Sequence, residues 1–247
     1  MRNVWTIARR EYNYYFSTPA AYVVTFMILG ILGILFVIQL NVSLYQQFAP
    51  GIQSILAPLA WMLIFLAAPA LTTRTIASES RLGTIETLLT APIRDWELVV
   101  GKWLGAYLAL LSVVATTLVF PILLNALVTP GIDQGAMLAG YLGISLFLAA
   151  IVAVGVVISS LFEHQVATFL VTEAVFLILF FVISAITQFM SPSELWGTVL
   201  GYFDVQGPLY NNLLRGVLDL RDIAQYLSLT TLALFLTSVS VATRRWR

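Results

Sequence analysis

Charged side chains gather in one short stretch of an otherwise apolar chain. Residues 77–103 read ASESRLGTIETLLTAPIRDWELVVGKW, with six charged residues before Lys102. The acidic ones (Glu79, Glu86, Asp95 and Glu97) balance the cations in and beside the stretch, whereas helices that lie on lipid are rich in Lys and Arg. An interfacial helix without a partner stays an alternative. The mixed charge favours contact with another protein.

Groups for catalysis or metal binding are scarce along the rest of the chain. There is no cysteine, and the one histidine, His164, stands in a short turn beside Glu163, so thiolate chemistry and a transition-metal site are not expected. No pair of carboxylates or Ser-His pair indicates an intramembrane enzyme. No G-x-x-x-x-G-K-[ST] run is present to cradle ATP. We expect no enzymatic activity, no metal and no cofactor on this chain.

The composition is that of an integral membrane protein. Of 247 residues, 60% are hydrophobic and 10% charged, the mean hydropathy is +0.94, and soluble domains carry about 25% charged residues. The formal net charge of zero gives no electrostatic case for nucleic acid. The first 22 residues lack the pattern of a cleavable signal, so we expect the first span to remain in the mature protein.

Six windows are long and apolar enough to cross a bilayer as helices. Lipid offers the backbone no hydrogen-bond partner, and the runs are too long for barrel strands, so we predict an all-α membrane domain over 1–247. Pro58, Pro69 and Pro121 are expected to kink their helices. Small residues spaced four apart, Gly101 with Gly105 and Gly155 with Ser159, favour close helix contact. The predicted spans are 20–40, 55–73, 103–128, 137–162, 166–189 and 223–243.

The distribution of Lys and Arg predicts the orientation. Ten of the 12 cations fall in the two termini and in 74–102 if these lie in the cytoplasm, as the positive-inside rule requires. Residues 190–222 then lie outside. They are too apolar for a solvated loop and too short for two spans, so we expect re-entrant or interfacial helices there. A lid over an exit and plain surface contact both remain open.

The cytoplasmic segment has the pattern of two helices around a proline. Ile85, Leu88 and Leu89 share one face at i, i+3 and i+4. Gly83 is expected to cap this short helix, with Glu86 at its third position. Pro92 ends it, and Asp95 is expected to cap the helix that continues into the third span.

Two further segments have polar groups near apolar ones. In 3–16, Trp5, Ala8, Tyr12 and Tyr15 fall at helical spacing, which predicts an interfacial elbow helix or, equally, an aromatic anchor before the first span. Glu173 lies about 10 Å inside the fifth span at the helical rise. We expect it to face the bundle interior or water, either near a translocation route or gating contact, or in an interhelical hydrogen bond to Ser or Thr or drawn toward an arginine.

The run LTTRTIASESRLGTIETLLTAPIRDWELVVGKWLGAY resembles the cytoplasmic segment of type 2 ABC exporter permeases, above all the gliding-motility branch. A second run, LLRGVLDLRDIAQYLSLT, resembles the segment that enters the last span in that branch, and the six-span layout extends the likeness over nearly the whole chain. The matching positions are Glu79, Arg81, Gly83, Thr84, Glu86, Leu88, Leu89, Pro92, Asp95, Glu97, Gly101 and Lys102.

The resemblance implies a coupling helix at 83–89 that docks in a cleft of a separate ATPase subunit, with Ile85 on its face and Glu79 and Arg81 as polar contacts. It also implies two ATPase subunits that carry ATP and Mg, a second permease copy or homologue, and residence in the bacterial inner (cytoplasmic) membrane. An ATP-independent secondary transporter or channel, or a membrane anchor that transports nothing, are the alternatives. The cargo, export versus mechanical work, the dimer type and any outer-surface accessory subunit stay open.

Overall fold

The computed structural model describes residues 2–46, 51–77, 94–128, 131–190 and 195–244. Every regular element among them is a helix, and six helical runs are long and apolar enough to cross a membrane. This confirms the predicted all-α architecture with six spans. The runs are α2 (Pro19–Gln46); α3 (Gln53–Met62) with η1 (Leu63–Ala67) and α4 (Ala68–Thr72); α7 (Asp95–Thr116) with α8 (Val119–Leu127); α9 (Gln134–Leu161); α10 (Gln165–Leu177) with η2 (Ile178–Val182) and α11 (Ile183–Phe189); and α14 (Leu220–Arg244).

Prolines explain the breaks in two of the spans. Pro121 has no N–H to give to the carbonyl of Thr117, which instead accepts from the N–H of Phe120 at 3.1 Å, and the chain turns between α7 and α8. In the second span, the π-helical turn η1 directly precedes α4, which has Pro69 in its first turn. Pro58 lies inside α3 without ending it.

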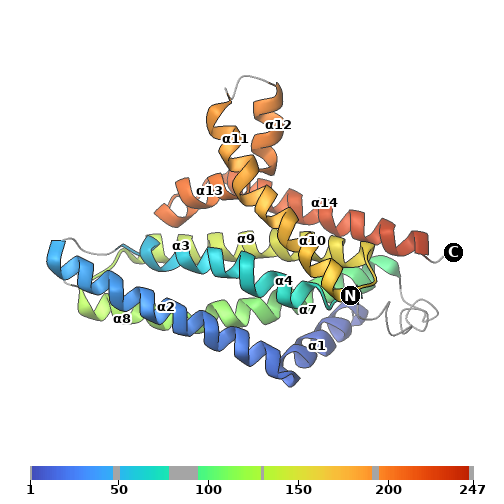
Figure 1. The fold of residues 1–247 in the computed structure, drawn as a ribbon, viewed down its shortest axis with the longest axis horizontal. Helices are drawn as coiled ribbons and strands as arrows, with labels where there is room; N and C mark the ends of the chain where they lie inside the picture. Colours follow the sequence, from blue (N-terminus) through green and yellow to red (C-terminus); the bar gives the residue numbers. More distant parts are fainter. Residues whose placement is uncertain (1, 47–50, 78–93, 129–130, 191–194, 245–247) are drawn as a thin grey trace.

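Helix α9 is the centre of the bundle and the most buried of the six spans. It contacts α3, α4, α7, α10 and α14, and it runs through the middle of the molecule in Figure 1. Its sequence has no charged side chain and many small ones. Gly155 lies directly against Thr72 of α4, and Gly143 against Leu213, so neighbours come close to its backbone. Helix α9 is therefore the helix against which four of the other five spans pack.

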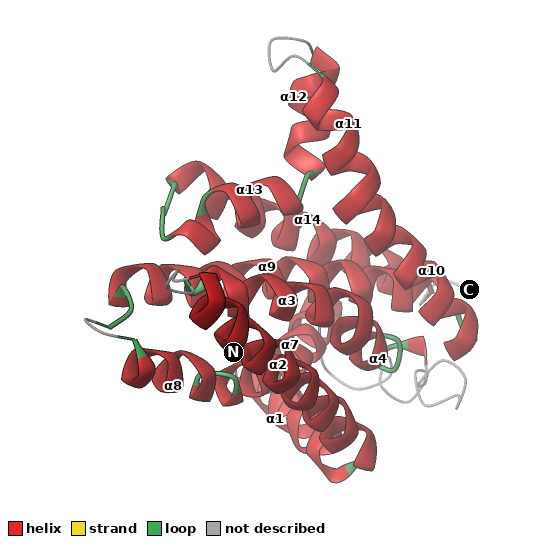
Figure 2. Ribbon diagram, turned by 60° about the vertical axis from the view of Figure 1, so that its left-hand side comes forward, coloured by secondary structure: helices red, strands yellow, loops and turns green. Residues whose placement is uncertain are grey.

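The connections gather at two ends of the bundle (Figure 1). The ends of α2 and α8 lie toward the left, whereas α7 and α10 begin, and α14 ends, toward the right. The run from α10 to α11 leaves the bundle at an angle, which Figure 2 shows from a second side. Much of the apolar surface of α2 and of the α10–α11 run is exposed, as expected of helices that face lipid or another membrane subunit.

Short helices join α11 to α14: α12 (Leu195–Phe203), α13 (Gln206–Asn211) and η3 (Leu213–Arg215). Gln225 of α14 donates from Nε2 to the carbonyls of Gly201, Tyr202 and Asp204, at 3.2, 3.0 and 2.8 Å. The hydroxyl of Tyr210 donates to the carbonyl of Ala57 at 3.0 Å, and burial raises the pKa of that phenol, so it stays a donor. These contacts fix the short helices against α14 and α3.

Candidate functional site at the ends of the charged segment

The residues predicted to dock a partner all lie outside the residues that the structure describes. They are Glu79, Arg81, Gly83, Thr84, Ile85, Glu86, Leu88 and Leu89. The structure does describe both flanks of segment 78–93, at 72–77 and from Arg94 onward. A candidate site for coupling is built by these flanks, and we call it the anchor: Glu11, Thr75, Glu97, Lys102 and Ser159 with the backbone groups that they bind.

The chain enters the segment from α4 through a tight turn. The hydroxyl of Thr75 donates to the carbonyl of Thr72 at 2.7 Å. The N–H groups of Ile76 and Ala77 both donate to Oγ of Ser159 on α9, each at 3.1 Å. Ile76, Ala77 and Ser159 are buried, where an unsatisfied backbone N–H is costly. The incoming flank is therefore held to the central helix by hydrogen bonds.

The chain leaves the segment through the first turn of α7. Arg94 has an extended backbone and is the N-cap. The carboxylate of Glu97 accepts from the N–H of Arg94 at 3.2 Å and from Nδ2 of Asn3 on α1 (Arg2–Ser17) at 3.3 Å. The expected cap at Asp95 is wrong, because Asp95 is already the first helical residue and Glu97, three residues after Arg94, reaches back to it.

Lys102 ties the two flanks together. Its Nζ lies 3.0 Å from Oε1 of Glu11 on α1 and donates to the carbonyl of Thr75 at 2.7 Å. The side chain is 1% exposed. A buried ammonium needs both a counter-charge and hydrogen-bond acceptors, and the anchor supplies them from α1 and from the incoming flank. Three segments that are far apart in sequence thus meet at one nitrogen.

Two glycines let α1 come close enough to α7 for these contacts. A Cβ on Gly105 would lie 2.5 Å from Cβ of Glu11 and 2.9 Å from the carbonyl oxygen of Ala8, and one on Gly101 would lie 2.8 Å from Ile7. The predicted close contact at this pair of glycines is therefore with α1. The order of these contacts shows that α1 and α7 run parallel.

The buried face of α1 covers part of the predicted apolar stripe. Ala8, Glu11 and Tyr15 are buried, Tyr12 is half-buried and Trp5 is 58% exposed. The interfacial elbow helix stays a prediction. Burial follows the side of α1 that meets α7, and on that side a carboxylate, Glu11, is favoured because Lys102 lies opposite it.

Glu173 lies on α10, outside the anchor. Its Oε2 is buried and has no hydrogen-bond partner among the described residues, as is also the case for Oγ1 of the neighbouring Thr172. Within that part of the chain, neither the interhelical hydrogen bond nor the arginine pairing satisfies this oxygen. Its role stays a prediction.

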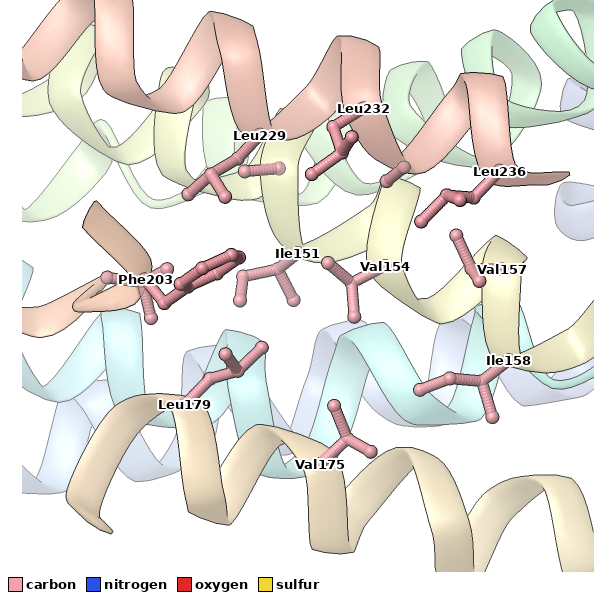
Figure 3. A pocket seen from close by; sticks show the side chains of 13 residues that line it. Ile151, Val154, Val157, Ile158, Val175, Leu179, Phe203, Leu229, Leu232 and Leu236 are labelled. Carbon is pink, nitrogen blue, oxygen red and sulfur yellow. The ribbon is translucent and has the colours of Figure 1, made fainter. Parts of the chain in front are cut away.

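An apolar cavity of about 240 Å³ lies between α9, α10 and α14. Figure 3 shows Ile151 and Val154 of α9, Leu229 and Leu232 of α14, and Leu179 around one space. All the side chains that line it are apolar. It therefore offers no hydrogen bond or charge by which a polar cargo could be recognised.

The comparisons with known proteins decide the family. The sequence matches the family model described as "ABC-2 family transporter protein" over residues 24–244. The chain belongs to the ABC-2 transporter family. No curated protein matched the sequence. The family match confirms the resemblance and makes the chain a membrane component of an ABC transporter, a permease; the gliding-motility branch stays a prediction.

Sequence reasoning found some members of the anchor and missed others. Lys102 was part of the motif that carried the resemblance, and Ser159 was noted for its small size, but neither contact was foreseen. Glu11 and Thr75 were not singled out. Glu11 lies in α1, before the range that matches the family model. The sequence signal that could have indicated Glu11 is its spacing: it lies three residues after Ala8 and four before Tyr15, on the same face of the helix.

Proposed function

We propose that this ABC-2 permease couples ATP hydrolysis on two separate ATPase subunits to export or mechanical work across the membrane, as half of a permease dimer. The observation that carries the proposal is that both flanks of segment 78–93 are fixed, by Ser159 on one side and by Glu97 on the other, and are joined through Lys102. A push on a segment moves the spans only when its ends are attached to them.

The anchor determines where such a push would go. The outgoing flank is the first turn of α7, and the incoming flank is bonded to α9 and, through Lys102, to α7 and α1. A displacement of the segment would therefore turn or shift α7 against α9. ATP binding would bias two arrangements of the spans through this connection, as an effector must bind two states differently to shift them.

The docked part would be the short helix at 83–89, with Leu88 and Leu89 in the cleft of the ATPase and Glu79 and Arg81 beside it. The partner would carry ATP and Mg. In this arrangement segment 74–102 and both termini face the cytoplasm and the short helices of 195–215 face the outside of the inner membrane. The concentration of Lys and Arg at the first set of segments supports this orientation.

The test is Leu88→Asp in the complex purified from native membranes, with Leu88→Met as the matched control. A charge at a residue buried in the ATPase cleft should abolish copurification of the ATPase subunit and its stimulation by the permease. Leu88→Met, which conserves volume, should retain both. Circular dichroism checks that the bundle folds in each variant. Normal assembly and stimulation with Leu88→Asp would sink the proposal. Transport that persists without an ATPase subunit would favour a secondary transporter or channel.

A further inference from the structure

A groove of about 570 Å³ runs between α1 and α7. Its α1 wall includes Trp5, Arg9 and Asn13, which are four residues apart and so share one face of the helix. Its α7 wall includes Leu108 and Ala115, seven residues apart on one face of that helix. The two helices touch at Gly101 and Gly105 and leave this open space farther along α7.

The two walls of the groove differ in chemistry. The α1 wall has a guanidinium, an amide and an indole, whereas the α7 wall is alkyl apart from Ser112. The hydroxyls of Ser112 and Tyr12 are 3.1 Å apart and satisfy each other. No carboxylate lines the groove. The groove is thus polar and cationic along one side and apolar along the other.

Arg9 lines the groove and is not part of the anchor. Its side chain is exposed, and it has no ion pair or hydrogen bond within the described part of the chain. Arg10, the next residue, points its Nη2 to Oε1 of Glu11 at 3.2 Å. A planar guanidinium with free donors suits a phosphate, to which it can donate two parallel hydrogen bonds.

We propose that the groove binds one anionic phospholipid, with the phosphate on Arg9 and Asn13 and an acyl chain along Leu108, Leu111 and Ala115. The order of contacts along the helices supports this direction. Ala8 lies beside Gly105, so Arg9 is at the shallow end, and the alkyl wall extends about 10 Å deeper at the helical rise. Trp5 at the shallow end is an interfacial residue type. We choose an anionic headgroup over a zwitterionic one because the charged side chain that lines the groove, Arg9, is a cation.

The proposal concerns the membrane domain alone and does not depend on an ATPase partner. Its test is native mass spectrometry of the purified full chain in mild detergent, titrated with dioleoyl phosphatidylglycerol and, separately, with dioleoyl phosphatidylcholine. We expect tighter retention of phosphatidylglycerol, in one-to-one stoichiometry. Arg9→Gln should weaken that binding about tenfold, as the loss of a charge-assisted pair predicts.

Arg10→Gln is the matched control, because it removes the same charge one residue away from the groove and should change the affinity less than about twofold. Ala115→Trp should also weaken binding, because it fills the apolar end without altering the charge. Equal losses in Arg9→Gln and Arg10→Gln would overturn the proposal in favour of general charge attraction. So would equal retention of the two lipids, unchanged binding in Ala115→Trp, or a loss of dimers instead of lipid in Arg9→Gln. Circular dichroism confirms that each variant is folded.

Discussion

Replacing Lys102 with methionine should destabilise the permease strongly, although methionine nearly preserves the volume. The substitution removes the ammonium that lies 3.0 Å from Glu11 and 2.7 Å from the carbonyl of Thr75. The carbonyl of Thr75 then loses its donor, and the carboxylate of Glu11 loses its buried counter-charge and keeps the exposed Arg10 at 3.2 Å. Removal of one partner from a buried ion pair costs about 3–5 kcal/mol. Glu11→Leu should cost a similar amount, because it leaves the ammonium without its counter-charge.

The double variant distinguishes the interaction energy of the ion pair from independent destabilisation by each substitution. Glu11→Leu with Lys102→Met removes both charges of the buried pair and leaves the buried carbonyl of Thr75 without the donor described above, for about 1–3 kcal/mol. The double variant should therefore be more stable than either single one, with a coupling energy of at least about 3 kcal/mol. Arg10→Gln is the control on the same carboxylate oxygen. The side chain of Arg10 is 56% exposed, so its loss should change stability by about 1 kcal/mol or less.

The free energies come from unfolding in mixed micelles at a rising fraction of denaturing detergent, followed by circular dichroism. Stimulation of the ATPase subunit is measured alongside for every variant that folds. If the two single effects add up in the double variant, Lys102 and Glu11 do not act as a pair, and the anchor as described is refuted. A loss of stimulation in the stable double variant would show that the connection, apart from stability, transmits the movement.

Two further predictions concern the other contacts of the anchor. Ser159→Ala should speed amide hydrogen exchange at Ile76 and Ala77 by about 10- to 100-fold, because it removes an acceptor worth about 1–3 kcal/mol. Ser160→Ala is the control and should leave both exchange rates unchanged, because the hydroxyl of Ser160 donates to the carbonyl of Val157 in its own helix. Equal effects of the two substitutions would contradict the contact with Ser159. Gly105→Ala should lower the free energy of unfolding by about 1–3 kcal/mol, because the added methyl group overpacks against Glu11. Gly30→Ala should not lower it, because nothing lies within 4 Å of the added Cβ. Both are measured by the same unfolding titration, and an equal loss of stability in Gly30→Ala would contradict the close approach of α1.

The six spans could be predicted because each is an apolar run long enough to act alone, with no information needed from its neighbours. The residues at which the spans begin and end were harder to predict. The start of α7 at Asp95 and the role of Arg94 as its cap depend on Glu97, which is held by Asn3 from another helix. The breaks near Pro69 and Pro121 could be expected from the missing N–H, but the π turn before Pro69 could not.

The anchor could not be predicted, because its partners are brought together only by the fold. Glu11 and Lys102 are 91 positions apart, and Ile76 and Ser159 are 83 apart. Each residue has an ordinary local explanation: a carboxylate on an amphipathic helix, a lysine near a membrane surface, a serine at a helix contact. Only the arrangement of α1, α7 and α9 shows that they satisfy one another.

The parallel contact of α1 with α7 has a consequence for biosynthesis. Glu11 leaves the ribosome 91 residues before Lys102, and two complete spans are made in between. Until α7 is inserted, the carboxylate has no buried counter-charge, so α1 must wait at the wet surface of the membrane and dock late. The hydrogen bonds from Ile76 and Ala77 form later still, because their acceptor, Ser159, lies near the end of α9. Both flanks of the segment proposed to dock the ATPase are therefore complete only after the fourth span, so a docking that needs them fixed would follow the insertion of α9.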